Sequence, residues 1–125
     1  HMFPHRARQQ VEAFAENLGL VAKPAPDGSY GFIFAKSGLL SFVASQDEAR
    51  VVVCLVRPSS QVNLSTPIRF FRLAGLDPAT SNFVHAGISA DNNCVLAISL
   101  EESRFDMQSI FETLSRLTDL YDSLA

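Results

Sequence analysis

Three short apolar segments in the first half of the chain, separated by only three or four residues, constrain the fold more than any other feature. They span residues 30–35, 39–45 and 50–56. Connections this short join antiparallel neighbours, because a parallel pair of strands needs a crossover of about a dozen residues or more. The sequence therefore predicts a three-stranded antiparallel meander.

The meander has apolar side chains on both of its faces. An antiparallel sheet with one hydrated face alternates apolar and polar residues. Here Tyr30, Phe32 and Phe34 point one way and Ile33 points the other, and neither alternate set within residues 51–56 is polar. Helices are expected to cover one face. The other face is then expected to need a partner.

Helices are predicted at both ends of the chain. The first runs from Pro4 or His5 to Leu18 and stops at Gly19, because its apolar residues recur at helical spacing. The last begins near Asp106, capped by Ser103 or Asp106, and its apolar residues recur every three or four positions to the C-terminus. This last helix is predicted to pack on the sheet, with a helix–helix seam as the alternative.

The middle of the chain predicts one helix and two more strands. Thr66 is a candidate N-cap with Pro67 in the first helical position, and the helix is expected to reach about Leu76. Strands follow at residues 83–89 and 94–100 across a turn rich in Asp and Asn. The predicted order is α-β-β-β-α-β-β-α, an α+β fold with a twisted antiparallel sheet packed by helices. A single domain over residues 3–125 is expected, with His1-Met2 interpreted as a cloning remnant.

Charge and cysteine usage exclude several classes of function. The net charge is −3 and the ten basic residues are scattered, whereas nucleic-acid binders usually carry a basic stripe. No apolar run approaches the roughly 20 residues that span a bilayer, and no signal peptide is recognisable. Cys54 and Cys94 lie in apolar strands without CxxC spacing, which favours buried thiols over a disulfide or a metal site. We expect a cytoplasmic protein with neither nucleic-acid binding nor membrane insertion.

No constellation of catalytic residues is present in the sequence. His5 and His85 have no acidic or cysteine neighbour at ligand spacing, and the adjacent Glu101 and Glu102 point to opposite faces of an extended chain. Residues 28–31 are too short for a phosphate-binding loop. The sequence therefore predicts a non-enzymatic protein without cofactor or metal.

Two segments of the second half resemble class I type III secretion chaperones of the Tir-chaperone-like family. These are residues 70–76 and residues 83–100, in which Ala86-Gly87-Ile88 and residues 95–100 correspond to the two strand signatures of that family. Element order, length and acidity extend the resemblance to nearly the whole chain. Glu101 departs from the pattern, because proline is frequent at that position, and the middle helix is short.

The resemblance implies a virulence-associated homodimer that binds the N-terminal region of a secreted effector as an extended, export-ready segment. Such binding combines strand addition at a sheet edge with apolar side chains in pockets. The candidate client-binding residues are Val11, Phe14, Phe32, Phe34, Phe42 and Val52. The candidate dimer-interface residues are Arg69, Phe70, Phe71 and His85. For each residue of both sets, internal packing is the alternative.

Two other functions stay open at the level of the sequence. One is a regulatory or scaffold module of the same fold that binds a folded partner. The other is a small-ligand-binding domain that uses the aromatic-rich sheet as a pocket. Ten phenylalanines and no tryptophan suit apolar packing and docking better than stacking against a sugar. A ligand-binding domain should be a monomer stabilised by its ligand, whereas a chaperone should be a stable dimer when empty.

Overall fold

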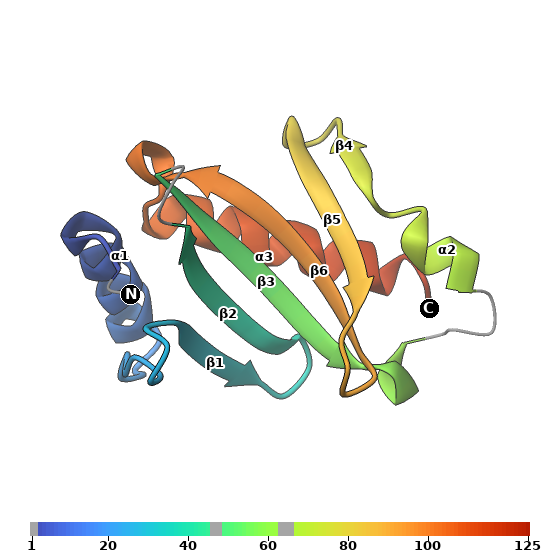
Figure 1. Cartoon of the computed structure of the whole chain (residues 1–125), viewed down its shortest axis with the longest axis horizontal. Helices are drawn as coiled ribbons and strands as arrows, with labels where there is room; N and C mark the ends of the chain where they lie inside the picture. The colour runs from blue at the N-terminus through green and yellow to red at the C-terminus, as the bar shows by residue number, and fades with distance from the viewer. Residues whose placement is uncertain (1–2, 46–48, 63–66) are drawn as a thin grey trace.

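A computed structural model describes residues 3–45, 49–62 and 67–125 (Figure 1). The helices are α1 (His5–Asn17), α2 (Pro67–Phe71) and α3 (Met107–Asp122), with short 3-10 turns at Ser59–Gln61 and Glu102–Arg104. The strands are β1 (Tyr30–Phe34), β2 (Gly38–Ser45), β3 (Arg50–Pro58), β4 (Gly75–Asp77), β5 (Asn82–Ile88) and β6 (Asn93–Glu101).

These described strands form one antiparallel sheet in the order β1-β2-β3-β6-β5-β4. The predicted meander occupies one half of the sheet, and β6 joins it by pairing with β3 along nine residue positions. The predicted α+β class and the order of the long elements are confirmed. The connection at residues 46–48 and the proposed cap at Thr66 lie outside the described residues.

The prediction was wrong about the end of the middle helix. Helix α2 ends at Phe71, and Leu76 belongs to β4, where it pairs with Phe83. Gly75 has a φ of +123°, a conformation that is foreign to a helix and that glycine adopts at little cost. The chain therefore leaves the helix early and adds a three-residue edge strand.

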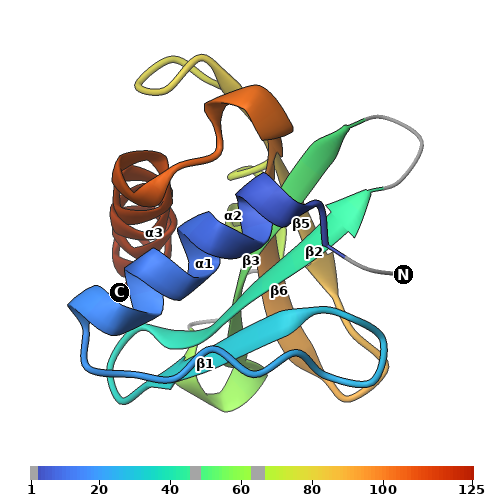
Figure 2. The same cartoon turned by 90° about the vertical axis from the view of Figure 1, so that its left-hand side faces the viewer.

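Both long helices lie on the same side of the sheet (Figure 2). Phe14 of α1 contacts Phe32 and Phe42, with ring centroids 5.7 and 6.0 Å apart. On α3, the Tyr121 hydroxyl donates to the backbone oxygen of Leu55 at 2.7 Å and also lies 3.0 Å from that of Cys94. Burial raises the pKa of this phenol. The core is therefore a helix layer against one sheet face, as expected for α3.

The ends of the long helices follow the local sequence. Asp106 caps α3 through a reciprocal pair of hydrogen bonds with Ser109, which decides between the two predicted caps. Helix α1 ends at Asn17, and Gly19 follows in the left-handed region with a φ of +71°.

Candidate protein-binding surface

The sheet face opposite α1 and α3, called the open face below, carries exposed apolar side chains. Successive strand residues alternate between faces, and the helix-side residues of β3 are buried while the intervening ones are only half-buried. On the open face, Ile33 is 85% exposed and Leu76 is 71% exposed. The other exposed apolar residues of this face are Leu39, Val43 and Phe83.

The centre of the open face carries no Asp, Glu, Lys or Arg side chain. Its middle row consists of Ser41, Cys54, Ala97 and His85, which are paired across β2, β3, β6 and β5. Charged side chains stand at one end, where the Arg50 guanidinium donates to the hydroxyl of Ser99 at 2.7 Å and to its carbonyl oxygen at 2.9 Å. Such a surface is suited to a neutral, apolar polypeptide rather than to a nucleic acid or an ionic ligand.

The thiol of Cys54 lies within this middle row and is free and half-buried. Burial raises its pKa, so the thiol stays protonated near neutral pH. Cys94 is also free and lies in the core. Both cysteines are therefore free thiols; the predicted burial holds for Cys94, whereas Cys54 is only half-buried.

A groove of about 330 Å³ lies at the end of the open face nearest the β1–β2 hairpin. Ile33, Leu39 and Val56 form its apolar part. The remaining lining residues are Phe34, Ala35, Gly38, Pro58, Gln61 and Asn93. Gly38 permits the close approach of the hairpin to β3, because a Cβ atom there would overlap the carbonyl oxygen of Val56. The groove is large enough for one or two aliphatic side chains of a bound segment.

Strand β1 forms one end of the sheet, and within the described residues no strand pairs with its outer edge. An exposed edge offers backbone donors and acceptors to an added strand. The groove includes Ile33 and Phe34 of this strand. Edge and groove are thus adjacent, so one extended segment can use both.

The structure corrects most of the predicted client-binding set. Val11, Phe14 and Phe42 are fully buried and Phe32 is 6% exposed, because α1 lies directly over β1 and β2. These four side chains form the core of a single chain and are not surface groups. Phe34 and Val52 are half-buried. Phe34 shares the helix face with Tyr30 and Phe32 and packs against the core at the border of the groove, whereas Val52 lies on the open face.

The predicted dimer-interface residues also include both buried and exposed side chains. Phe70 is fully buried and stacks on Tyr121 with a centroid distance of 6.4 Å, so its side chain does not reach the surface. Phe71 is 45% exposed, and Arg69 and His85 are exposed. All of them belong to α2 or β5, which lie on the far side of β6 from the meander (Figure 1).

Sequence reasoning missed three exposed apolar residues of this region. Ile68 is 64% exposed on α2, Leu76 lies on β4, and Phe83 contacts His85 with centroids 4.9 Å apart. The period of two that places Phe83 beside His85 was readable in the sequence. The exposure of Leu76 on a sheet face could not be predicted, because the sequence places this residue in the expected middle helix.

Within residues 3–45, 49–62 and 67–125, no three His, Cys, Asp or Glu side chains gather in a way that would hold a metal ion. None of the helices described is long and apolar enough to cross a membrane.

Comparison with known proteins shows the fold but not the sequence family. Neither a family model nor a curated protein sequence matches this chain. Among solved structures, a chain of the HopA1–SchA chaperone–effector complex superposes with a TM-score of 0.75 at 10% identity, covering 95% of this chain and 92% of that chain.

Two further solved structures have the same architecture. One holds the Yersinia pestis type III secretion chaperone SycH in complex with a stable fragment of YscM2, and its chain matches with a TM-score of 0.71 at 15% identity, covering 95% of this chain and 99% of that one. The other is the ExsC–ExsE complex, with a TM-score of 0.71 at 12% identity and coverage of 95% and 90%. The chain therefore has the fold found in type III secretion chaperone complexes.

Proposed function

We propose that this protein is a cytoplasmic type III secretion chaperone that binds the N-terminal region of an effector in extended, export-ready form. The observation that carries the proposal is an uncovered apolar sheet face on this fold. Ile33, Val43 and Leu76 are far more exposed than core strand residues such as Val53 and Ile98. An apolar face of this kind marks a protein-interaction site.

The client segment is expected to lie along β1 and over the hairpin groove. Backbone hydrogen bonds to the β1 edge would supply sequence-independent affinity, and apolar side chains in the groove would supply selectivity. Ile33 and Leu39 line that groove, with Phe34 beside them. Val52 lies on the open face beyond the middle row, paired with Val43, so a client that reaches it must cross the centre of this face. This binding requires no titrating group, no metal and no cofactor.

A homodimer is the second part of the proposal. Phe71 and Ile68 on α2, together with Leu76 and Phe83 on β4 and β5, leave apolar side chains exposed at the end of the sheet opposite β1. Arg69 and His85 are exposed in the same elements. A second copy that covers this end would remove the apolar groups from water and leave the β1 edge free for the client.

Affinity purification of the tagged protein from its native cytosol tests the client. Limited proteolysis and mass spectrometry of the captured material should give one dominant protein, held through a protease-sensitive N-terminal segment at one copy per chaperone dimer. A matched purification with Ile33→Asp, which places a charge in the groove, should lose that client.

Two results would contradict the proposal. One is a partner that is folded and resistant to protease, which would indicate a scaffold or regulatory module. The other is the absence of a protein partner combined with stabilisation of a monomer by a small molecule, which would indicate a ligand-binding domain.

A further inference from the structure

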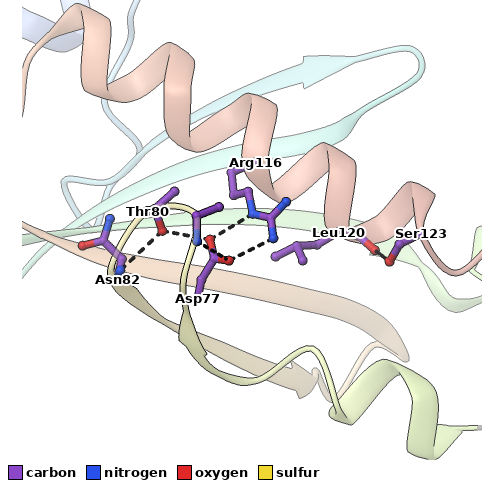
Figure 3. Close-up of polar contacts among 7 residues, drawn as sticks. Asp77, Thr80, Asn82, Arg116, Leu120 and Ser123 are labelled. Atoms are coloured by element: carbon purple, nitrogen blue, oxygen red, sulfur yellow. Dashed lines mark hydrogen bonds and ion pairs between the residues drawn. The ribbon is translucent and has the colours of Figure 1, made fainter.

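A partly buried ion pair joins the edge strand β4 to helix α3 (Figure 3). Arg116 donates from Nε to Oδ2 of Asp77 and from Nη2 to Oδ1, both at 2.9 Å. The Asp77 side chain is 4% exposed and that of Arg116 is 30% exposed. This two-pronged geometry restricts the position of both partners more tightly than a single charge contact does.

The turn that follows β4 closes around the same carboxylate. The Thr80 hydroxyl donates to Oδ2 of Asp77 at 2.8 Å (Figure 3). The Ala79 amide lies 3.4 Å from Oδ1 of the same carboxylate. The hydrogen bonds from Arg116 hold the pKa of Asp77 below its ordinary range. The carboxylate is therefore charged and fully partnered, by Arg116 of α3 and by Ala79 and Thr80 of the β4–β5 turn.

The ion pair lies opposite the exposed apolar residues of this hairpin. Asp77 pairs with Asn82 on the helix side, whereas the preceding residue, Leu76, pairs with Phe83 and is 71% exposed on the open face. Successive strand residues point to opposite faces, so fixing Asp77 toward α3 fixes Leu76 away from it. A slip of one residue would exchange the two side chains.

The β4–β5 turn contributes to the register of β4, because the amides of Thr80 and Ser81 donate to the carbonyl oxygen of Asp77. The strand itself contributes little: it is three residues long, begins at Gly75 with a φ of +123° and, among the described strands, pairs only with β5. Short edge strands with few cross-strand contacts specify their pairing weakly. The Asp77 carboxylate is buried, so an arrangement that removed Arg116 from it would leave a buried charge without its partner, which is strongly disfavoured.

We propose that the Asp77–Arg116 pair is a positioning device for self-association, which holds β4 in the register that sets Leu76 beside Phe83 on the open face for contact with a second copy. The inference rests on the homodimer proposed above. Arg116 and Asp77 do not touch the partner in this arrangement. They act through the backbone of β4.

A double-mutant cycle between Arg116 and Leu76 tests the proposal. The variants are Arg116→Met, Leu76→Ser and the double variant, and sedimentation velocity gives the dimer dissociation constant of each. The two side chains belong to opposite faces, so independent contributions would multiply. We expect each single variant to weaken the dimer about tenfold and the double variant to weaken it by little more than either one, because Arg116 acts through Leu76.

Hydrogen exchange supplies the structural readout. Arg116→Met should increase amide exchange selectively at residues 75–84 and leave β3 and β6 protected, with Arg116→Lys intermediate because lysine keeps the charge but loses the two-pronged contact. Glu112→Gln, one turn earlier on α3, is the matched control and should change neither readout. If Arg116→Met does not fold, the dimer dissociation constant and the hydrogen exchange are measured on Arg116→Lys instead.

The outcomes separate this inference from the homodimer itself. A dimeric wild type whose dissociation constant is unchanged by Arg116→Lys and Arg116→Met refutes the positioning role alone. Multiplicative losses from Arg116→Met and Leu76→Ser also refute it. A wild type that is monomeric at all concentrations refutes the homodimer and this inference together.

Discussion

Replacement of Ile33 by threonine should weaken client binding while leaving the fold intact. Ile33 is 85% exposed on the edge strand β1 and lines the hairpin groove. Threonine keeps the β-branched shape that suits a strand, so the substitution changes polarity with little change in strand preference. The variant thus separates the surface role of this residue from its place in the fold.

The expected magnitude follows from the exposure of the side chain. Burial of a whole aliphatic side chain stabilises by about 1.5–3 kcal/mol, and nearly all of the Ile33 surface is still in water in the free protein. Threonine retains one methyl group and adds a hydroxyl. We therefore expect a loss of about 1–2 kcal/mol in binding, or roughly five- to thirtyfold in Kd. The free energy of unfolding should change by less than about 0.5 kcal/mol.

The assay titrates the N-terminal segment of the captured client against wild type and Ile33→Thr by calorimetry, with urea unfolding of the free proteins in parallel. Val21→Thr is the matched control, since Val21 is 76% exposed but lies outside the sheet. Equal affinity of Ile33→Thr and wild type would refute the assignment of the groove. A loss of affinity shared by Val21→Thr would show that general surface apolarity, and not the groove, binds the client.

Three further predictions concern the fold that presents this surface. Phe14→Ala should lower the free energy of unfolding by about 3–5 kcal/mol in urea titrations, because it empties a fully buried site; a loss below about 1 kcal/mol would contradict its core position. Gly38→Ala should destabilise by about 1–3 kcal/mol through its φ of +112° and overlap with the Val56 carbonyl, whereas Gly31→Ala, with ordinary contacts, should be nearly neutral in the same assay. Asp77 has a lowered pKa in the folded chain, so its stabilisation is present above the unfolded pKa of about 4 and is lost as pH falls through the lowered value. Asp77→Asn should therefore flatten the fall in unfolding free energy below about pH 4, and an unchanged acid profile would refute the role of this carboxyl.

The sequence alone predicted the meander and an apolar face that the helices leave uncovered. Connections of three or four residues after residues 30–35 and 39–45 leave only antiparallel pairing, which the structure confirms. The apolar residues on both faces predicted an uncovered face, because helices on one side cannot bury both. These conclusions required only local spacing and the period of two of a strand.

The sequence did not determine which face the helices cover. Phe32 and Ile33 are adjacent and both apolar, yet one is 6% exposed and the other 85% exposed. The choice depends on α1 packing across β1 and β2 through Phe14, a contact between residues distant in the chain. For this reason four predicted client residues are core residues, whereas Ile33, which is strongly exposed in the groove, was not among the candidates.

At the other end of the sheet, too, the sequence did not determine which apolar side chains are buried. Phe70 and Phe71 are neighbours on a five-residue helix, and only the position of Tyr121 on α3 decides that Phe70 is buried and Phe71 remains exposed. The ion pair that holds Asp77 of β4 against α3 likewise joins residues 39 positions apart. Local periodicity identifies which residues share a face, but burial is settled by packing between distant segments, and that information exists only in the folded chain.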